Sequence, residues 1–372
     1  MIVKKTVLLD ALKKVMPGVD KGTGLIEGAD TFVFLSGAVH TYNDAISVSV
    51  PLPGAEDLKG SVKAKEFFAL VNKLASEDIE IDVQEGKWSL KAGRTRGTIT
   101  LYQAGVVEFL QALKLGELAW KPLPVDFSSA LRLCKMACNA TPMRGIFVGD
   151  YLMISTDTTR INRYSFLELD DGGPVADKIP TDWQSLDPFW IDDPAAGELI
   201  KLGSLSQYSV SPGWVHFLSD DGAVFSCKKK DVTLFPAKQV SMTLTQVKKL
   251  QDLVSGPLPR EIGEAVDRVS VFGNEQASGG NTITLHIHQL WITIESSRTT
   301  GSVSEDLPWE APLETDPDLE VTVDHSFLVE AGRKVSSLRI KKMGDKQCLI
   351  FEADHYLQLA GTVKKASVVA AA

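Results

Sequence analysis

Apolar residues recur along the chain with two periods, one typical of helices and one typical of strands. The stretch from residue 60 to residue 102 shows both. Four apolar side chains have the spacing of one helix face over 64–75: Phe67, Leu70, Val71 and Leu74. Three runs of alternating apolar and polar residues follow, at 79–83, 88–90 and 98–102, and Glu85-Gly86 between the first two is a turn signal. This stretch therefore predicts one helix followed by three strands.

The same order of a short strand, a helix and three strands recurs six times. The expected helices cover 6–16, 64–75, 127–138, 194–203, 244–255 and 325–335, so that their starts lie on average about 64 residues apart. Two repeats make a domain of ordinary size, and prolines at Pro122, Pro124 and Pro236 mark linkers. We expect three domains, at 1–120, 121–236 and 237–372.

The fifth repeat is the least regular of the six. We expect a strand at 239–244, the helix over 244–255 and another strand at 267–273. A Gly- and Pro-containing insertion at 255–263 and a polar turn at 274–281 are the expected loops.

Such repeats predict an α+β protein in which sheets form the outside of a ring and helices line its inside. Every repeat has exposed strand edges, and pairing each edge with the next repeat removes the risk of aggregation. A closed ring removes the last edge. Because homo-oligomers with closed symmetry are the usual way to complete a ring, we expect a two-fold homodimer.

Cations on the expected helices suggest what the ring would enclose. The chain carries a formal net charge of −9, which argues against a simple basic nucleic-acid binder. Each expected helix nevertheless has at least one Lys or Arg beside its apolar stripe. The candidate DNA-contacting residues are Lys13, Lys14, Lys73, Arg132, Lys135, Lys201, Lys248, Lys249, Arg333 and Lys334. Taken singly these residues would only solvate helix faces, but together they favour sequence-independent binding of double-stranded DNA.

Composition and the N-terminal sequence indicate the class of protein and its compartment. Hydrophobic residues make up 44% and charged residues 23% of the chain, as in a globular protein, and no apolar run approaches the roughly 20 residues of a membrane span. The N-terminus lacks the features of a signal peptide, so we expect a cytoplasmic protein with no membrane contact. The four scattered cysteines are expected to be reduced thiols.

Catalytic motifs are weak. His286 and His288 alternate along one expected strand, but a lone pair of histidines is a poor metal site. Gly22, Gly24 and Gly28 follow a helix instead of a strand, and no Gly-Lys-Ser/Thr completes a phosphate loop. We therefore expect no catalytic residue, no metal and no cofactor, and a protein that is not an enzyme.

Several local motifs resemble those of the DNA polymerase III beta subunit family, the bacterial DNA sliding clamps. Arg144-Gly145-Ile146-Phe147 is similar to that family's RGVLF-like strand, and residues 156–161, TDTTRI, are similar to its TDGHRL motif. Residues 91–96 resemble its SGRSRF stretch, and Phe235-Pro236 its Leu-Pro opening of the third domain. The resemblance covers nearly the whole chain. It implies a ring that encircles duplex DNA and tethers the DNA polymerase and the clamp loader through short peptide motifs.

The same resemblance implies a hydrophobic peptide-binding pocket. Carried over by position, it would contain Phe147, Thr156, Thr158, Arg160, Ile161, Pro236, Val240, Leu357 and Leu359. Ordinary core packing is an equally good reading of Phe147, Ile161 and Leu359. Thr158 and Thr159 replace the family's Gly-His, and the C-terminus, GTVKKASVVAAA, replaces its Met-Pro-Met-Arg-Leu tail. These departures fit a clamp from a phage or another mobile element, acting in the cytoplasm of the bacterial host.

Two functions from other classes stay open. A structural or scaffold ring, for instance a virion component, would use the same closure without DNA. A hydrolase built on the same sheets would need His286 or a neighbouring group as part of a metal site.

Overall fold

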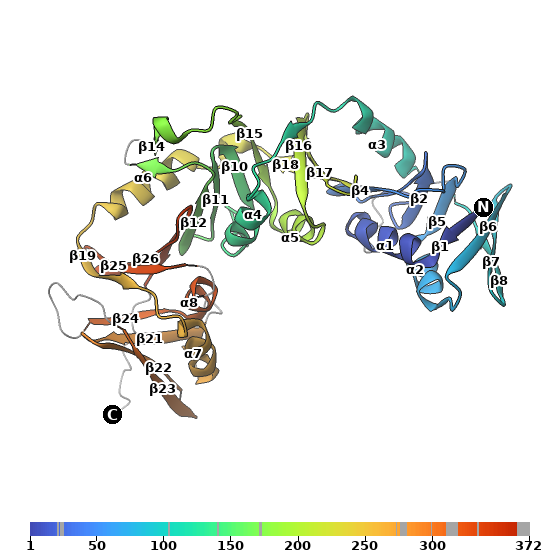
Figure 1. The fold of residues 1–372 in the computed structure, drawn as a ribbon. Helices are drawn as coiled ribbons and strands as arrows, with labels where there is room; N and C mark the ends of the chain where they lie inside the picture. Colours follow the sequence, from blue (N-terminus) through green and yellow to red (C-terminus); the bar gives the residue numbers. More distant parts are fainter. Residues whose placement is uncertain are drawn as a thin grey trace. The chain divides into compact units, whose positions relative to one another are not determined.

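The computed structural model describes residues 1–20, 22, 26–102, 105–139, 141–170, 173–272, 274–275, 281–298, 300–309, 319–332 and 335–362. The chain folds into two compact units (Figure 1). The first unit comprises Met1–Ser129 and Phe189–Asp231, and the second comprises Ala130–Pro188 and Val232–Ala372.

The first unit contains three repeats. The first repeat is β1 (Ile2–Lys4), α1 (Lys5–Val15), β2 (Thr31–Leu35), β3 (Ala38–Tyr42) and β4 (Ile46–Pro51). The second is β5 (Gly60–Lys63), α2 (Ala64–Lys73), β6 (Asp78–Gln84), β7 (Lys87–Ala92) and β8 (Thr95–Thr100), followed by α3 (Val106–Ala112) and β9 (Lys121–Pro122). The third is β15 (Leu186–Ile191), whose first residues precede the boundary of the unit, α5 (Asp193–Lys201), β16 (Leu205–Ser211), β17 (Trp214–Ser219) and β18 (Val224–Lys230).

The second unit contains the other repeats. α4 (Phe127–Lys135) begins just before its boundary and leads to β10 (Ile146–Asp150), β11 (Leu152–Thr156), β12 (Arg160–Ser165) and the small pair β13 (Leu169–Asp170) and β14 (Gly173–Pro174). α6 (Ala237–Lys248) precedes β19 (Asp252–Pro257), α7 (Ile262–Val269), β20 (Asn274–Glu275), β21 (Asn281–Ile287), β22 (Trp291–Arg298) and β23 (Gly301–Pro308). The last repeat is β24 (Leu319–Asp324), α8 (His325–Ala331), β25 (Ser337–Met343), β26 (Lys346–Glu352) and β27 (Tyr356–Gly361).

The helices pack on the sheets through the apolar faces that their sequences present. In the first unit, Phe67 of α2 contacts Phe34 and Trp88, whose rings lie 5.0 Å apart. All three side chains are buried, and burying each such side chain contributes roughly 2–3 kcal/mol. In the second unit, α7 and α8 lie side by side (Figure 1). A Cβ on Gly332 would lie 2.9 Å from the backbone nitrogen of Gly263, so glycine is what permits this approach.

The structure confirms five of the six expected repeat helices. α1, α2, α4, α5 and α8 fall within two to four residues of the expected bounds. The strands expected after them are also present. In the fifth repeat, β21 and β22 form a hairpin. The fold is thus the α+β repeat architecture that the pattern predicts.

The prediction for the fifth repeat is wrong. Residues 239–244 belong to helix α6, which ends at Lys248, and residues 252–257 form strand β19. The repeat helix is α7, where both an insertion and a strand were expected. Val247 and Val254 are both buried, but one lies on a helix and the other on a strand, a case that apolar spacing alone does not resolve. Pro257, Pro259 and Gly263 suggested a loop and hid the helical spacing of Ile262, Ala265, Val266 and Val269.

Two simpler expectations can be checked directly. All four cysteines are buried and free, and burial raises the pKa of the Cys134 thiol to about 12, so this thiol is protonated and unreactive. Among the described residues, no helix is long and apolar enough to cross a membrane. Most of the turn expected at 274–281 lies outside the described residues.

Candidate functional site

A cationic cavity lies in the first unit, where helices α1, α2 and α5 meet. It has a volume of about 860 Å³ and an apolar floor that includes Phe68 and Phe225. Four lysines and two carboxylates surround it: Lys13, Lys14, Lys65, Lys201, Asp10 and Glu198. The structure therefore brings together three of the predicted DNA-contacting residues, Lys13, Lys14 and Lys201.

Two of these lysines are already paired within the chain. Lys14 Nζ lies 2.7 Å from a carboxylate oxygen of Asp10 and 2.7 Å from one of Asp221, and these bonds raise the pKa of Lys14. Burial alone would raise the pKa of Asp221, but bonds from Lys14, Ser219 and the Ala223 N–H lower it to about 2. Lys201 Nζ lies 3.0 Å from Glu198. Pairing reduces the charge that these lysines can offer to a phosphate.

Four other cations of the repeat helices are exposed and form no ion pair among the described residues. Lys13, Lys65, Lys73 and Arg132 are exposed and form no ion pair with any described residue. Lys135 of α4 is half-buried. The exposed, unpaired side chains are the best placed to contact an external polyanion.

The remaining predicted cations lie elsewhere. Lys248 is the last residue of α6 and Lys249 follows it, so neither is on a repeat helix. Lys248 Nζ lies 3.2 Å from Glu352. Arg268, the cation of the true repeat helix α7, is held by Glu305 at 2.5 Å. Arg333 and Lys334 lie outside the described residues.

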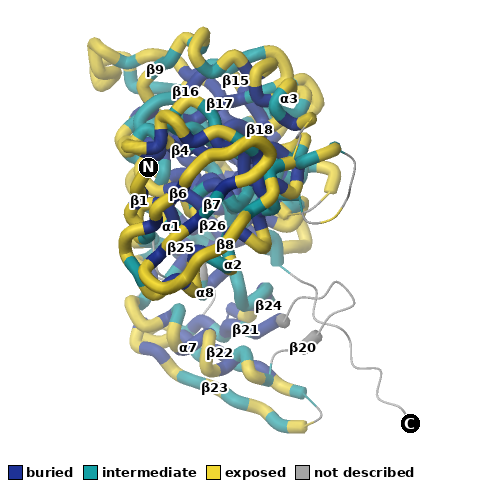
Figure 2. The backbone as a smooth tube through the Cα atoms, turned by 90° about the vertical axis from the view of Figure 1, so that its right-hand side faces the viewer, coloured by how far each residue is buried: buried dark blue, intermediate teal, exposed yellow. Residues whose placement is uncertain are grey.

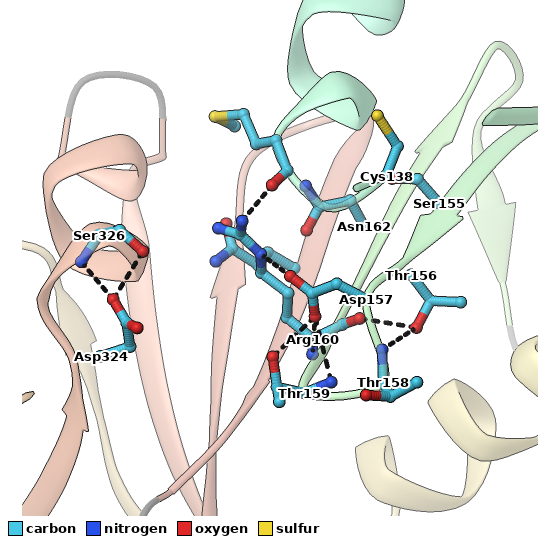
Figure 3. Close-up of polar contacts among 12 residues, drawn as sticks. Cys138, Ser155, Thr156, Asp157, Thr158, Thr159, Arg160, Asn162, Asp324 and Ser326 are labelled. Carbon is cyan, nitrogen blue, oxygen red and sulfur yellow. Dashed lines mark hydrogen bonds and ion pairs between the residues drawn. The ribbon is translucent and has the colours of Figure 1, made fainter. Parts of the chain in front are cut away.

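The turn between β11 and β12 carries several of the predicted peptide-pocket residues (Figure 3). Asp157 Oδ1 accepts the backbone N–H of Arg160 at 2.8 Å and that of Thr159 at 3.1 Å. Thr156 Oγ1 donates to the Arg160 carbonyl at 2.8 Å and accepts the Thr158 N–H at 3.2 Å. Thr158 is exposed, with φ at +73°, a conformation that few non-glycine residues adopt. The Asp157 and Thr156 side chains therefore fix a strained turn.

Arg160 has a structural role in the second unit. Its side chain is 7% exposed and its Nε donates to Asp157 Oδ2 at 2.7 Å. The same guanidinium donates to the Met136 carbonyl and lies 4.7 Å from the centre of the Phe327 ring. A buried charge held by this many partners positions the turn.

Apolar residues of the predicted pocket gather beside this turn. Ile161, Leu357 and Leu359 pack in one cluster with Leu244 and Val247 of α6. Val240, also on α6, is buried, and Pro236 is the residue before that helix. The Phe147 ring stacks on Phe235, with ring centres 5.0 Å apart.

Sequence reasoning missed the contribution of α6. Leu244 and Val247 cover the strands at this site, and their spacing of three residues on a helix was the available signal. Because the region was read as a strand followed by a helix, these two residues were not expected to face Ile161.

His286 lies in β21 and His288 directly follows that strand. His286 Nε2 lies 3.1 Å from Glu295, and His288 packs against the Trp291 ring at 4.8 Å. Across the described parts of the chain, no group of three or more His, Cys, Asp or Glu residues is placed to hold a metal ion.

The fold defined by these repeats is the DNA-clamp fold. No protein-family model matches the chain, and a search of curated protein sequences also finds no match. Among solved structures, the chain is similar to the DNA polymerase sliding clamp of Bacillus subtilis, with a TM-score of 0.77, 18% identity and 98% of each chain covered. It is similar to the Helicobacter pylori beta clamp bound to a DNA ligase peptide (TM-score 0.73, 13% identity, 98% of this chain and 99% of that one). A third similar structure is the Pseudomonas aeruginosa sliding clamp bound to griselimycin (TM-score 0.74, 17% identity, 98% and 99%).

Proposed function

We propose that this protein is a DNA sliding clamp, a non-enzymatic processivity factor that encircles duplex DNA and tethers a polymerase. The observation that carries this proposal is the match of 98% of the chain to bacterial sliding clamps. The repeat helices supply exposed cations for phosphates, and phosphate contacts of this kind are independent of sequence and compatible with sliding. A clamp of this type would act in the cytoplasm of a bacterium or of a phage-infected cell.

The proposed ring is a homodimer of chains with three domains, at 1–120, 121–236 and 237–372. Two open sheet edges support closure. β8 pairs with β7, and β23 pairs with β22, and within the described residues neither has a strand on its other side. Five of the six residues of β8 are exposed (Figure 2). Such edges are templates for pairing with another chain.

The two edges carry opposite charges. Arg96 lies in β8 and Arg94 lies just before it, whereas Asp306 and Glu305, which also binds Arg268, lie in β23. Pairing β8 of one chain with β23 of a second copy brings these charges together twice in a two-fold ring. Complementary charge favours this pairing over β8 with β8.

Charge reversal tests ring closure. Arg96→Glu is expected to weaken the dimer at least tenfold, as measured by analytical ultracentrifugation, and adding Asp306→Lys is expected to restore it. Lys87→Glu, on the neighbouring strand β7, is the matched control and should leave the dimer intact. A wild-type chain that stays monomeric, alone and on DNA, would contradict the ring.

DNA contact is tested on the exposed helix cations. Replacing Lys13, Lys65 and Lys73 together by Ala should reduce the salt dependence of DNA binding by roughly 0.9 per lost phosphate contact. It should also shorten the products of primer extension. Lys114→Ala, on the segment after α3, is the control. A scaffold ring would lose neither property, so an unchanged salt slope in the triple variant favours that alternative.

The second unit offers the peptide site for the polymerase and clamp loader. Phe147, Ile161, Val240, Leu357 and Leu359 supply apolar contacts beside the turn that holds Thr158. The ligase peptide bound to the Helicobacter pylori clamp supports this use of the fold. Phe147→Ala is expected to lower polymerase affinity at least tenfold. The dimer should stay closed, because the Phe147 side chain is only half-buried. Unchanged polymerase affinity would move the peptide site elsewhere.

A further inference from the structure

Two strand pairs that join neighbouring repeats have the same register, so the chain contains two copies of one junction. In the second unit, β12 pairs with β27 and Ile161 lies opposite Leu359. In the first unit, β4 pairs with β18 and Ser47 lies opposite Ser226. The hairpins correspond when 114 is added to each residue number, since Val33 opposite His40 matches Phe147 opposite Ile154.

The turn of the peptide site is duplicated as well. Asn43 Oδ1 accepts the N–H of Ile46 at 2.9 Å and that of Ala45 at 3.3 Å, as Asp157 Oδ1 does in the second unit. Asp44 has φ at +71° and its counterpart Thr158 has φ at +73°. The backbone that presents the proposed peptide site in the second unit is therefore also present in the first.

This correspondence locates a second site. Tyr42 takes the position of Thr156, because the two lie at matching places in their hairpins. Phe109 takes the position of Val240, because each is the fourth residue of the helix that follows the last strand of a repeat pair, α3 or α6. Both counterparts are aromatic where the second unit has small side chains.

A cavity of about 490 Å³ is present at this position in the first unit. Its walls include Tyr42, Phe109, Leu113, Leu118, Ser211 and Trp214. The Tyr42 ring stacks on Phe109 at 5.3 Å and lies 5.7 Å from Trp214. Phe109 is 44% exposed, so part of this aromatic wall faces solvent. The volume lies within the range of pockets that hold small ligands or peptide anchors.

The charges of the lining residues indicate which kind of polymer this cavity can bind. Among its lining residues, Lys114 Nζ lies 3.1 Å from Glu117, so the two charges cancel. The α1–α2–α5 cavity, with four lysines against two carboxylates, suits phosphate instead. A cavity lined mainly by apolar side chains and carrying no net charge matches an uncharged segment with apolar side chains. Ser211, bonded to His216 Nε2 at 2.8 Å, adds one polar group at the edge.

We propose that this cavity is a second peptide-binding site, which takes a short uncharged linear peptide through a branched aliphatic or aromatic anchor. The inference rests on the proposed function, because it assigns to the first junction the kind of ligand proposed for the second. A ring with both sites could hold two peptide segments on each chain.

Disulfide tethering tests the site without a known partner. All native cysteines are buried, so Leu118→Cys places a single accessible thiol in the cavity wall. The probes are two cysteamine-linked dipeptides, Leu-Phe and Ser-Gly, offered in equal amounts under thiol exchange. We expect the Leu-Phe adduct to exceed the Ser-Gly adduct roughly tenfold in intact mass spectra, since the apolar probe buries more surface. Val125→Cys, fully exposed, is the matched control and should show no preference.

Two further variants separate the possible outcomes. Phe109→Asp on the Leu118→Cys background should abolish the preference, because it places a charge in the aromatic wall at an exposed position that folding tolerates. Thr158→Cys reports on the second-unit site in the same way. Equal adducts at Leu118→Cys overturn the second site, whether or not Thr158→Cys selects Leu-Phe. Selection at Thr158→Cys alone leaves the proposed function standing, and the dimer and DNA measurements are independent of both.

Discussion

The two junctions share a backbone but are built from opposite kinds of side chain. In the second unit, Ile161, Leu359 and Ile350 form an apolar layer under α6. At the matching places of the first unit stand Ser47, Ser226 and His216, which are buried and polar. His216 Nδ1 lies 2.8 Å from Ser226 Oγ and its Nε2 lies 2.8 Å from Ser211 Oγ.

The aromatic residues are distributed the other way. The first junction places Tyr42, Phe109 and Trp214 around its cavity, and the second has Thr156, Val240 and Cys348 at those positions. A polar layer with satisfied hydrogen bonds costs little, and the three rings above it recover apolar burial. The two junctions thus share the strand register and the turn, whereas the side chains at their contact surfaces differ in kind.

The largest expected difference concerns the two turns. Asp157→Ala removes two backbone hydrogen bonds and leaves buried Arg160 without its carboxylate, and breaking such a pair costs about 3–5 kcal/mol. Asn43→Ala removes the equivalent backbone bonds but no charge partner, and should cost about 1–2 kcal/mol. Urea denaturation of both variants measures the difference. Equal losses would show that the Asp157–Arg160 pair contributes nothing beyond the turn.

Much of this comparison could be predicted from the sequence, because strand alternation and helical spacing are local properties. The meanders at 31–51 and 146–165 lie where the repeat predicts three strands after the helices expected at 6–16 and 127–138. The linker helix α6 was not predicted, because Val240, Met242 and Leu244 alternate with polar residues, which is the pattern of a strand. Its place on Ile161 and Leu359 depends on contacts across more than 80 residues, which no local pattern encodes.

The candidate site was predicted in part. The resemblance placed Ile161, Leu357 and Leu359 together, and the structure shows that they share one cluster. It also placed Arg160 in the pocket, and in the structure that side chain is buried against Asp157 and Phe327. The role of an arginine depends on which carboxylate and ring it meets, and spacing does not reveal that. The duplicate site escaped notice because Tyr42 and Thr156 share no chemistry, only a position.

A smaller expected effect is the pH dependence of stability that His216 of the polar layer gives to the first junction. Burial lowers the pKa of His216 to about 4, so the folded protein holds this ring neutral. As pH falls from 6.5 to 4, the unfolded chain binds a proton that the folded chain does not, and stability drops by about 3 kcal/mol. Above pH 6.5 the contribution is complete.

The test compares His216→Gln, which keeps a hydrogen-bonding side chain, with the wild type between pH 7 and pH 4. The variant should lose this part of the acid destabilisation. His40 has a pKa that burial also lowers, and it is unchanged in both proteins, so the difference between them isolates His216. Identical pH profiles would mean that the His216 ring binds a proton as readily in the folded protein as in the unfolded chain.

The smallest expected effect is an exchange of anchors between the two sites. Phe109→Val gives the first junction the side chain of the second, and should lower selection of Leu-Phe in the tethering assay several-fold, because part of the ring stack on Tyr42 is lost. Phe109→Leu, which retains more apolar surface, is the control and should fall between the two. Because Phe109 is only partly buried, neither variant should change the free energy of unfolding by more than about 1 kcal/mol. If the selection of Leu-Phe does not follow the size of residue 109, Trp214 and Tyr42 alone hold the anchor. The two junctions would then differ through their cavity walls and not through their linker helices.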